Sequence, residues 1–195
     1  SKNTDVAIEF SQPNEAYGNI EYCLQNSIPV VSGTTGWLDK KPHLDQLCLE
    51  MEGAFFYASN YSIGVNLFFD VNKKLARLMN SFSNYKVSME EIHHTEKKDE
   101  PSGTAITLAE GIIQEKKGID HWVLGSGNSN NLPIRSKREG KVPGTHIVTY
   151  SSAVDDIEIK HTAHSREGFA SGALMVAEWI LEKKGVLTMQ DFLQI

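Results

Sequence analysis

Short strand-like runs alternate with helix-like runs over the first third of the chain, and this alternation limits the fold more than any other feature. The strand-like runs cover residues 6–10, 28–31 and 54–57. Helix-like runs over residues 13–26 and 42–51 separate them, and a proline lies near the start of each one. Because such an alternation is typical of a parallel sheet with helices on both faces, we predict an α/β fold for this segment.

A different pattern begins near residue 64. Helix-like periodicity over residues 64–82 and 104–116 flanks a strand-like run at residues 86–93. We predict a second, α+β domain over residues 64–166 with a mixed, mainly antiparallel sheet, and expect residues 167–195 to complete the domain formed by residues 1–63. The remaining elements are predicted as strands at residues 134–138, 146–151 and 155–163 and a helix at residues 169–183.

Two of the predicted helices carry apolar stripes that we expect to face a core. Spacings of three and four residues define both stripes. The stripe of the helix at residues 64–82 consists of Phe68, Val71, Leu75, Leu78 and Phe82. The stripe of the helix at residues 169–183 consists of Ala170, Ala173, Leu174, Ala177 and Ile180.

Composition narrows the functional classes. The 195 residues carry a net charge of −6, and the basic residues form no single stripe, which argues against a nucleic-acid partner. No apolar run approaches the roughly 20 residues that span a bilayer, so we expect no membrane partner. Cys23 and Cys48 lie in helix-like runs and are expected to be reduced thiols of a cytoplasmic protein. The chain enters a strand-like run soon after Ser1, and we expect a further segment before it in the encoded protein.

One segment, residues 91–105, concentrates the residues most suited to chemistry. It holds two adjacent histidines, His93 and His94, and a nearby lysine, Lys97. Histidine exchanges protons near neutral pH, and lysine can bind an anion or protonate a nitrogen. The turn at residues 102–104 precedes a predicted helix, where backbone N–H groups favour a carboxylate. Together these residues predict a pocket for a small acid that undergoes proton transfer.

Other interpretations of the same residues stay open. The histidine pair could be an exposed strand end, Lys97 could belong to a solvated charge run, and Ser102 could be only the N-cap of the next helix. A metal site is a further alternative, since His161 and His164 could bring two imidazoles together. The other histidines available as ligands are His93, His94, His121 and His146. No cysteine-rich or His-Glu-x-x-His spacing supports it, so we predict no metal.

Two loops that follow predicted parallel strands form the second candidate region. The first is Gly-Thr-Thr-Gly at residues 33–36, and the second is the polar segment at residues 58–62. Ligands of α/β proteins bind at the carboxyl ends of the strands, where both loops would lie. Either loop could equally serve only to turn the chain.

The segment at residues 91–105 closely resembles the signature of the 4-hydroxy-tetrahydrodipicolinate reductases. The shared pattern is a His-His pair, a lysine three residues after the second histidine, and then Asp-x-Pro-Ser-Gly-Thr-Ala. Residues 30–37, with Gly-Thr-Thr-Gly, and residues 58–66, with Asn-Tyr-Ser-Ile-Gly-Val-Asn, resemble two further family segments in the same order. Residues 140–146 and 161–170 also look like family segments, so the resemblance covers essentially the whole chain.

The resemblance implies an activity and a role for each candidate residue. The activity is reduction of 4-hydroxy-tetrahydrodipicolinate, a small dicarboxylate, by NADH or NADPH in lysine and diaminopimelate synthesis. His93 is then the proton donor and acceptor, Lys97 is the second proton donor, and the protein is a homotetramer assembled through its second sheet. The implied substrate-binding residues are His94, Ser102, Gly103 and Thr104, and the implied cofactor-binding residues are Gly33, Thr34, Thr35, Ala58, Ser59, Asn60 and Tyr61.

The resemblance also implies that the first domain is an incomplete Rossmann-like nucleotide-binding domain. The family opens with a strand, a glycine-rich phosphate-binding loop and a helix, and no Gly-x-Gly-x-x-Gly occurs at the start of this chain. If that region is truly absent, we expect little cofactor binding or turnover. Two other functions remain alternatives: a nicotinamide-dependent dehydrogenase acting on an amino or imino acid, and a non-catalytic protein that keeps the fold and only binds a ligand.

Overall fold

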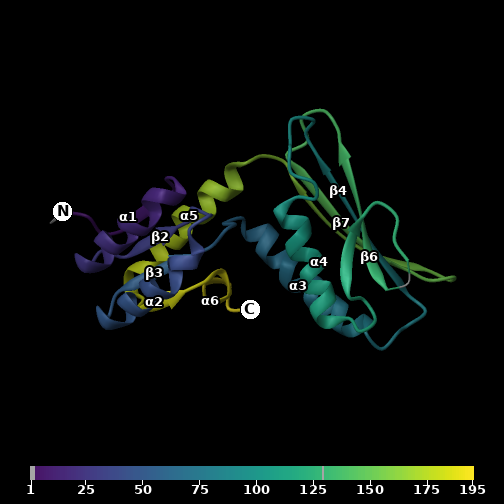
Figure 1. Ribbon diagram of the computed structural model, residues 1–195, viewed down its shortest axis with the longest axis horizontal. Coiled ribbons are helices and arrows are strands. Elements are labelled where there is room, and N and C mark those ends of the chain that lie inside the picture. Colours follow the sequence, from purple (N-terminus) through teal and green to yellow (C-terminus); the bar gives the residue numbers. More distant parts are fainter. Residues whose placement is uncertain (1–2, 129) are drawn as a thin grey trace. The chain divides into compact units, whose positions relative to one another are not determined.

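The computed structural model describes residues 3–128 and 130–195. The chain forms two compact units, Ser1–Asn66 with Glu167–Ile195 and Leu67–Arg166. The first unit is therefore built from both ends of the chain (Figure 1). Strand β9 (Gly185–Leu187), close to the C-terminus, pairs with β3 (Ala54–Tyr57) and so joins these two ends in one sheet.

The first unit contains a parallel sheet with the strand order β1-β2-β3-β9. Its other elements are β1 (Ala7–Glu9), α1 (Pro13–Gln25), β2 (Val30–Ser32), the 3-10 turn Leu38–Lys40, α2 (Lys41–Glu50), α5 (Glu167–Trp179), the 3-10 turn Ile180–Glu182 and α6 (Met189–Leu193). Neighbouring residues of β2 and β3 face opposite sides. Val30 and Phe55 pack with α1 and α2, whereas Val31 and Phe56 pack with α5, so helices cover both faces of the sheet.

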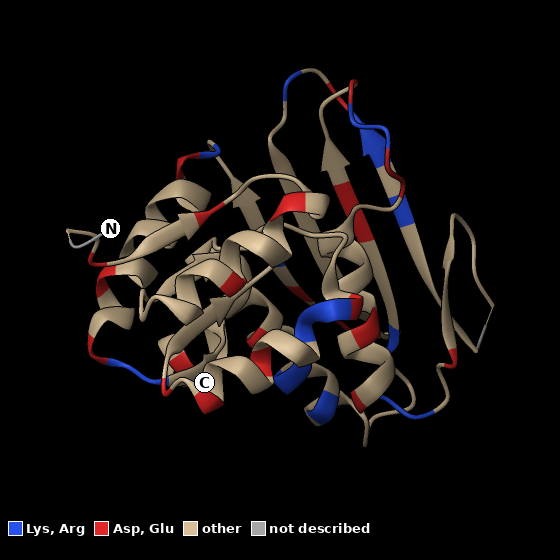
Figure 2. Ribbon diagram, turned by 60° about the vertical axis from the view of Figure 1, so that its left-hand side comes forward, with Lys and Arg blue, Asp and Glu red and all other residues tan. Residues whose placement is uncertain are grey.

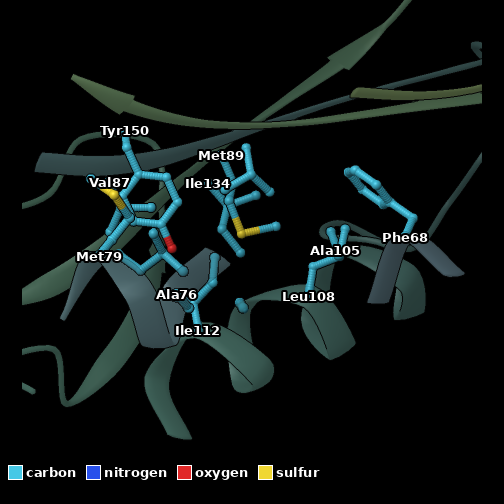
Figure 3. Packing of buried hydrophobic residues seen from close by; sticks show 13 residues of the cluster. Phe68, Ala76, Met79, Val87, Met89, Ala105, Leu108, Ile112, Ile134 and Tyr150 are labelled. Carbon is cyan, nitrogen blue, oxygen red and sulfur yellow. The ribbon is translucent and has the colours of Figure 1, made fainter. Parts of the chain in front are cut away.

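The second unit contains a five-stranded sheet with two helices on one face (Figure 1). Its elements are α3 (Ile63–Met79), β4 (Lys86–His93), α4 (Gly103–Glu115), β5 (His121–Leu124), β6 (Asn131–Arg138), β7 (Gly144–Ser151) and β8 (Asp156–Ala163). The strand order is β5-β6-β4-β7-β8. Residues such as Met89, Ile134 and Leu108 fill the core between the sheet and the two helices (Figure 3).

The predicted α/β class with a mixed second sheet is confirmed, but three details were wrong. The second sheet is not mainly antiparallel, because β4 pairs with β6 and β5 with β6 in parallel, while only the pairings of β7 are antiparallel. The prediction missed β5, a strand of four residues, and β9, a strand of three. The helix predicted at residues 169–183 ends earlier, and a 3-10 turn leads into β9.

Helix α3 is rotated relative to the apolar stripe predicted for it. Three residues of that stripe, Val71, Leu78 and Phe82, are exposed. A polar contact between the helices accounts for the rotation: Asn72 is buried, and its Nδ2 donates a hydrogen bond to the Leu108 carbonyl of α4 at 2.9 Å. The buried face consists of Val65, Phe68, Asn72, Ala76 and Met79.

The stripe predicted for α5 is corrected in the same way. Ala170 and Leu174 of that stripe are exposed, whereas Gly172 and Val176, which lay outside it, are buried. Small residues such as Gly172 allow α5 to pack closely against the backbone at Tyr61. A search for apolar residues at helical spacing does not detect a glycine.

Surface charge and cysteines agree with a folded protein of ordinary composition. Lysine and arginine residues are interspersed with aspartate and glutamate residues along the ribbon (Figure 2). Within the described ranges, no helix is long and apolar enough to cross a membrane. Cys23 on α1 and Cys48 on α2 are free thiols, as predicted.

Candidate active site

The buried face of strand β4 is apolar at the start of the strand and polar at its end. Its inward-facing residues change along the strand from the apolar Met89 to Glu91 and His93. The two neighbouring strands also carry polar residues at this level, since Glu91 is paired with Ser136 on β6 and with His146 on β7. Because residues paired across a sheet share a face, these polar side chains meet on the side of the sheet covered by the helices.

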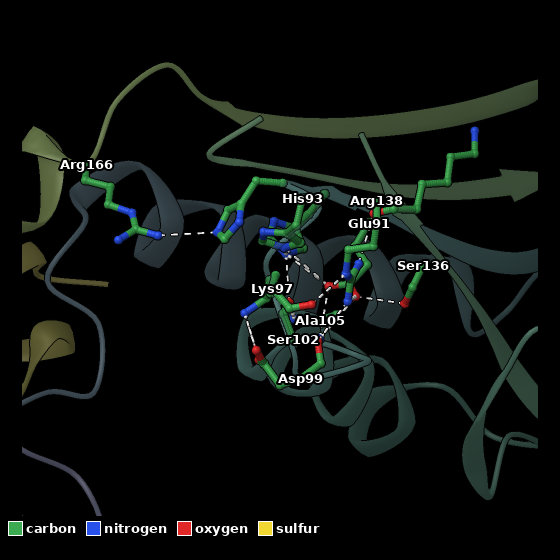
Figure 4. A network of polar contacts seen from close by, with 12 residues as sticks. Glu91, His93, Lys97, Asp99, Ser102, Ala105, Ser136, Arg138 and Arg166 are labelled. Carbon is green, nitrogen blue, oxygen red and sulfur yellow. Dashed lines mark hydrogen bonds and ion pairs between the residues drawn. The ribbon is translucent and has the colours of Figure 1, made fainter. Parts of the chain in front are cut away.

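The Glu91 carboxylate is the centre of this polar group (Figure 4). The residue is 0% exposed. The backbone N–H of Ser102 donates to its two oxygens at 3.2 and 3.1 Å, and Ser136 Oγ donates at 2.8 Å. Nε2 of His93 lies at 3.4 Å and Nη2 of Arg138 at 3.5 Å. Burial favours a raised pKa for this carboxyl, but hydrogen bonds from His93, Ser102 and Ser136 outweigh it, so its pKa lies below the ordinary value and Glu91 is ionised.

Two histidine rings meet beside Glu91. Nε2 of His93 lies 3.3 Å from Nε2 of His146, with the ring planes 70° apart. Nε2 of His146 also lies 3.1 Å from Oγ of Ser102. Both rings are buried. Burial, assisted by the neighbouring His93, lowers the pKa of His146 to about 4, so this ring is neutral at pH 7.

The start of helix α4 lies next to the two rings. Ser102 is its N-cap, and the Ser102 Oγ accepts a hydrogen bond from the Ala105 N–H at 3.2 Å. The N-cap interpretation of Ser102 is therefore confirmed. Gly103 is exposed and Thr104 half-buried in the first turn. Backbone N–H groups of a first turn have no partner within the helix, so this end suits a carboxylate.

The loop from β4 to α4 carries the predicted lysine. Lys97 Nζ contacts both carboxylate oxygens of Asp99 at 2.7 Å, and this hydrogen bonding lowers the pKa of the Asp99 carboxyl. Arg138 holds the loop to the end of β6, because its Nη2 donates to the Asp99 carbonyl at 2.8 Å. His94 begins the loop, and its Nε2 lies 3.4 Å from Nη2 of Arg166 (Figure 4).

The predicted cofactor residues lie in the first unit, after the carboxyl ends of β2 and β3. Glu9, at the end of β1, organises the first loop: its carboxylate accepts from Ser32 Oγ at 2.6 Å and from Thr34 Oγ1 at 3.0 Å. Tyr61 ties the second loop to the end of β2, since its hydroxyl donates to the Ser32 carbonyl at 2.6 Å. Among the predicted residues, Thr34, Ala58 and Tyr61 are buried, Gly33 and Asn60 are half-buried, and Thr35 and Ser59 are exposed.

The predicted site residues thus fall into two groups. His93, Ser102, Gly103 and Thr104 gather around the start of α4, with His94 and Lys97 on the adjoining loop, and the cofactor group lies in the other unit. Sequence reasoning missed several members of the first group. The sequence did contain a signal for Glu91, because it is an ionisable residue on the otherwise apolar face of a predicted strand. It contained no such signal for the residues on β6 and β7, which reach Glu91 only through strand pairing. The missed residues are Glu91, Ser136, Arg138, His146 and Arg166.

One group of three in the described part of the chain, Glu91 with His93 and His146, has the composition of a metal site. Its ligand atoms lie within 4.8 Å of one another. Hydrogen bonds already account for this arrangement, because two serines and both rings surround the carboxylate. The pair considered from the sequence, His161 and His164, belongs to no such group among these residues.

Comparison with known proteins identifies the family. The family model described as dihydrodipicolinate reductase, N-terminus, matches residues 1–61, and the one described as dihydrodipicolinate reductase, C-terminus, matches residues 64–193. The chain belongs to the dihydrodipicolinate reductase family. A relative from Christiangramia forsetii, named 4-hydroxy-tetrahydrodipicolinate reductase, is 52% identical over 97% of this chain and 79% of its own length. A relative of the same name from Methanoregula boonei is 33% identical over 99% of this chain and 76% of its own length.

A solved structure shares the fold of this dihydrodipicolinate reductase family member. It is a dipicolinate-bound dihydrodipicolinate reductase from a Paenisporosarcina species, with a TM-score of 0.77 at 24% identity. The match covers 96% of this chain and 73% of that one. These comparisons confirm the family resemblance and the fold class, and the roles of individual site residues stay predictions.

Proposed function

We propose that this chain reduces 4-hydroxy-tetrahydrodipicolinate to tetrahydrodipicolinate with NADH or NADPH, a step of lysine and diaminopimelate synthesis. The observation that carries the proposal is the buried cluster in which His93, Glu91 and the Ser102-capped start of α4 meet. It combines a proton-exchanging ring with an anion-binding helix end, the two groups that reduction of a small dicarboxylate requires. Family membership and the 52% identical reductase support the same activity.

The substrate side of the proposal assigns one task to each residue. The first-turn N–H groups of Gly103 and Thr104 bind one carboxylate, and Ser102 holds this turn as its N-cap. The 4-hydroxyl group of the substrate leaves as water together with a hydrogen of the neighbouring ring carbon. Hydride addition to the double bond that remains leaves an electron pair on the substrate ring, and His93 supplies the proton that it takes up. Lys97 is the second proton donor, and His94 borders the substrate.

The carboxyl edge of the first sheet fits a nicotinamide cofactor. Phe10 follows β1 and leaves 56% of its side chain exposed, which offers an aromatic surface at the edge where dinucleotides bind in such folds. The hydroxyls of Thr35 and Ser59 are exposed on the next two loops. We assign residues 33–35 and 58–61 to this cofactor, which supplies the hydride when bound.

Substitution of the two proposed proton donors tests the function. His93→Gln and Lys97→Ala are each expected to lower kcat at least about 100-fold while far-UV circular dichroism and Tm stay unchanged. His121→Gln and Lys98→Ala are matched controls at exposed positions and should keep full activity. A loss milder than about 100-fold would remove the substituted residue from its assigned role. Oxidation of an amino acid with no reduction of the dipicolinate precursor would favour the amino-acid dehydrogenase instead.

The proposal extends to organisation and location. Residues 1–63, completed by residues 167–195, form the cofactor domain, and residues 64–166 form the substrate and oligomerisation domain. The family resemblance supports a homotetramer assembled through the second sheet. The two free cysteines support a reducing compartment, the cytoplasm.

A further inference from the structure

We infer that Glu91 is a positioning residue: it keeps the proton of the neutral His93 ring on Nε2, so that Nδ1 is the nitrogen that exchanges a proton with the substrate. The catalytic part of this inference rests on the proposed function. The tautomer itself rests on the geometry around His93, to which Glu91, His146, Ser102 and Gly144 contribute.

Nε2 is the side of the His93 ring that faces the buried cluster. It lies 3.4 Å from Oε2 of Glu91 and 3.3 Å from Nε2 of His146. An ionised carboxylate can only accept hydrogen bonds. Glu91 is held in that state, because Ser102 and Ser136 donate to it and Arg138 lies 3.5 Å away. The nitrogen that faces Glu91 must therefore carry the proton.

His146 is consistent with this assignment. Its Nε2 lies 3.8 Å from Oε2 of Glu91, which is beyond hydrogen-bond distance and farther than Nε2 of His93. As a neutral ring His146 has a single N–H, and protons on both Nε2 atoms would face each other across 3.3 Å. Its proton therefore lies on Nδ1, and its Nε2 accepts. The Ser102 hydroxyl, 3.1 Å away, is free to donate to this nitrogen because Ser102 Oγ already accepts from Ala105 N–H.

Nδ1 of His93 is the open side of the ring. Among the described residues no hydrogen bond reaches this nitrogen, and it is not one of the buried polar atoms that lack a partner, so it belongs to the 7% of His93 that stays exposed. Gly144 keeps this side open. A Cβ at position 144 would lie 3.0 Å from Cε1 and 3.4 Å from Nδ1 of His93.

Glu91 also fixes the substrate end of the site. The carboxylate that faces the His93 ring accepts the backbone N–H of Ser102, the N-cap of α4. One buried side chain therefore sets the distance between the proton donor and the helix end assigned to the substrate carboxylate. Of the other charged groups nearby, Arg138 lies 3.5 Å from Glu91 and Asp99 pairs with Lys97, so Glu91 is the carboxylate that contacts the His93 ring.

The tautomer can be read directly in the protein by long-range 1H–15N correlation spectra. The ring signals of His93 are assigned by their loss in His93→Gln. The expected result for neutral His93 is a protonated Nε2 and an unprotonated Nδ1. A protonated Nδ1 would overturn the inference. This result does not depend on which substrate the enzyme reduces, so it separates failure of the inference from failure of the proposed function.

Three variants test the positioning role by kinetics and by the same spectra. Glu91→Gln is expected to lower kcat at least about 10-fold and to move part of the His93 proton to Nδ1, because a neutral amide can donate as well as accept. Glu91→Asp keeps an acceptor-only carboxylate and should keep the Nε2 tautomer at a reduced rate. Glu90→Gln is the control: this residue lies on the opposite face of β4 and pairs with Lys137 at 3.0 Å, so both rate and tautomer should stay unchanged.

Folding of the variants is checked by Tm, and Gly144→Ala keeps the inference testable if Glu91→Gln does not fold. The added methyl group crowds the open edge of His93 and leaves Glu91 in place. It is expected to lower kcat at least about 10-fold with the Nε2 tautomer retained. An unchanged His93 tautomer in a folded Glu91→Gln, or full activity of Gly144→Ala, would overturn the inference. An inactive wild type would instead refute the proposed function.

Discussion

A buried neutral histidine makes the stability of this protein depend on pH. Burial and the neighbouring His93 lower the pKa of His146 from 6.5 to about 4. Glu91 opposes this shift, and His161 and Lys97 add to it. The unfolded chain therefore takes up a proton below about pH 6.5 that the folded chain refuses until about pH 4. The stability associated with His146 is complete above that range and is lost as the pH falls through it.

Chemical denaturation at pH 7 and pH 5 measures this loss. The wild type is expected to lose more free energy of unfolding between the two pH values than His146→Gln, because the variant lacks the titrating ring. His121→Gln, at an exposed position, should behave as the wild type does. Equal losses in the wild type and in His146→Gln would show that the ring is not held neutral.

The same cluster shows which site residues a sequence can predict. His93, Lys97 and the turn at residues 102–104 lie within a dozen positions of one another, so local spacing was enough to select them. His146 and Arg138 reach the site only because β7 and β6 pair with β4, and no local pattern records that pairing. The sequence therefore predicted the part of the candidate site that lies on one strand end, loop and helix start, and it did not predict the residues that β6 and β7 contribute.

At the scale of a helix, the packing of α5 depends on Gly172, which lies against the backbone of Tyr61. A Cβ at Gly172 would overlap the carbonyl oxygen of Tyr61, a backbone atom that cannot turn away. Gly172→Ala is expected to cost about 1–3 kcal/mol of the free energy of unfolding, through overpacking. Gly18→Ala on α1 is the matched control. A Cβ there meets nothing within 4 Å, so we expect a gain of about 0.5–1 kcal/mol.

Urea or guanidinium unfolding of both alanine variants provides the measurement. Opposite signs of the change in midpoint support the close approach of α5 to Tyr61. A stabilised Gly172→Ala would mean that α5 lies farther from that carbonyl than the structure has it.

Helices also show where periodicity stops being informative. The start and end of α1 and α2 follow from proline positions and apolar spacing, and both agree with the prediction to within one residue. The buried face of α3 does not follow, because Asn72 and Ala76 occupy it while Val71 and Leu78 face outward. A polar or small residue at a helix contact carries no hydrophobic signal, although it decides the rotation of the helix.

At the scale of the whole molecule, each unit has its own core, and this accounts for the success of the fold-class prediction. The first unit packs helices on both faces of a parallel sheet, and the second packs α3 and α4 on one face of a mixed sheet. The fold class follows from the order of elements, which is alternating strands and helices in the first third and runs of strands later. This order is still recognisable when a single element is missed. Missing the edge strand β5 and the three-residue strand β9 therefore did not alter the fold class predicted for either unit.

The proposed tetramer leads to a test of which surface of the second unit is covered. The open face of its sheet, opposite the helices, carries the row Glu90, Ile147 and Lys160, with the half-buried Ile147 at its centre. A carboxylate at this position would be desolvated in an interface. Ile147→Glu is therefore expected to convert a tetramer into smaller species, measured by sedimentation velocity.

Leu78→Glu makes the same change in charge on the other side of the second unit. Leu78 is 68% exposed on the outward side of α3. If the tetramer forms through the sheet, this variant keeps the wild-type sedimentation coefficient, since its carboxylate stays in water. Dissociation by Leu78→Glu with an intact Ile147→Glu tetramer would move the interface to the apolar outward side of α3. A monomeric wild type would refute the tetramer and leave the proposed active-site cluster in place, because Glu91, Ser102 and His146 all lie within Leu67–Arg166.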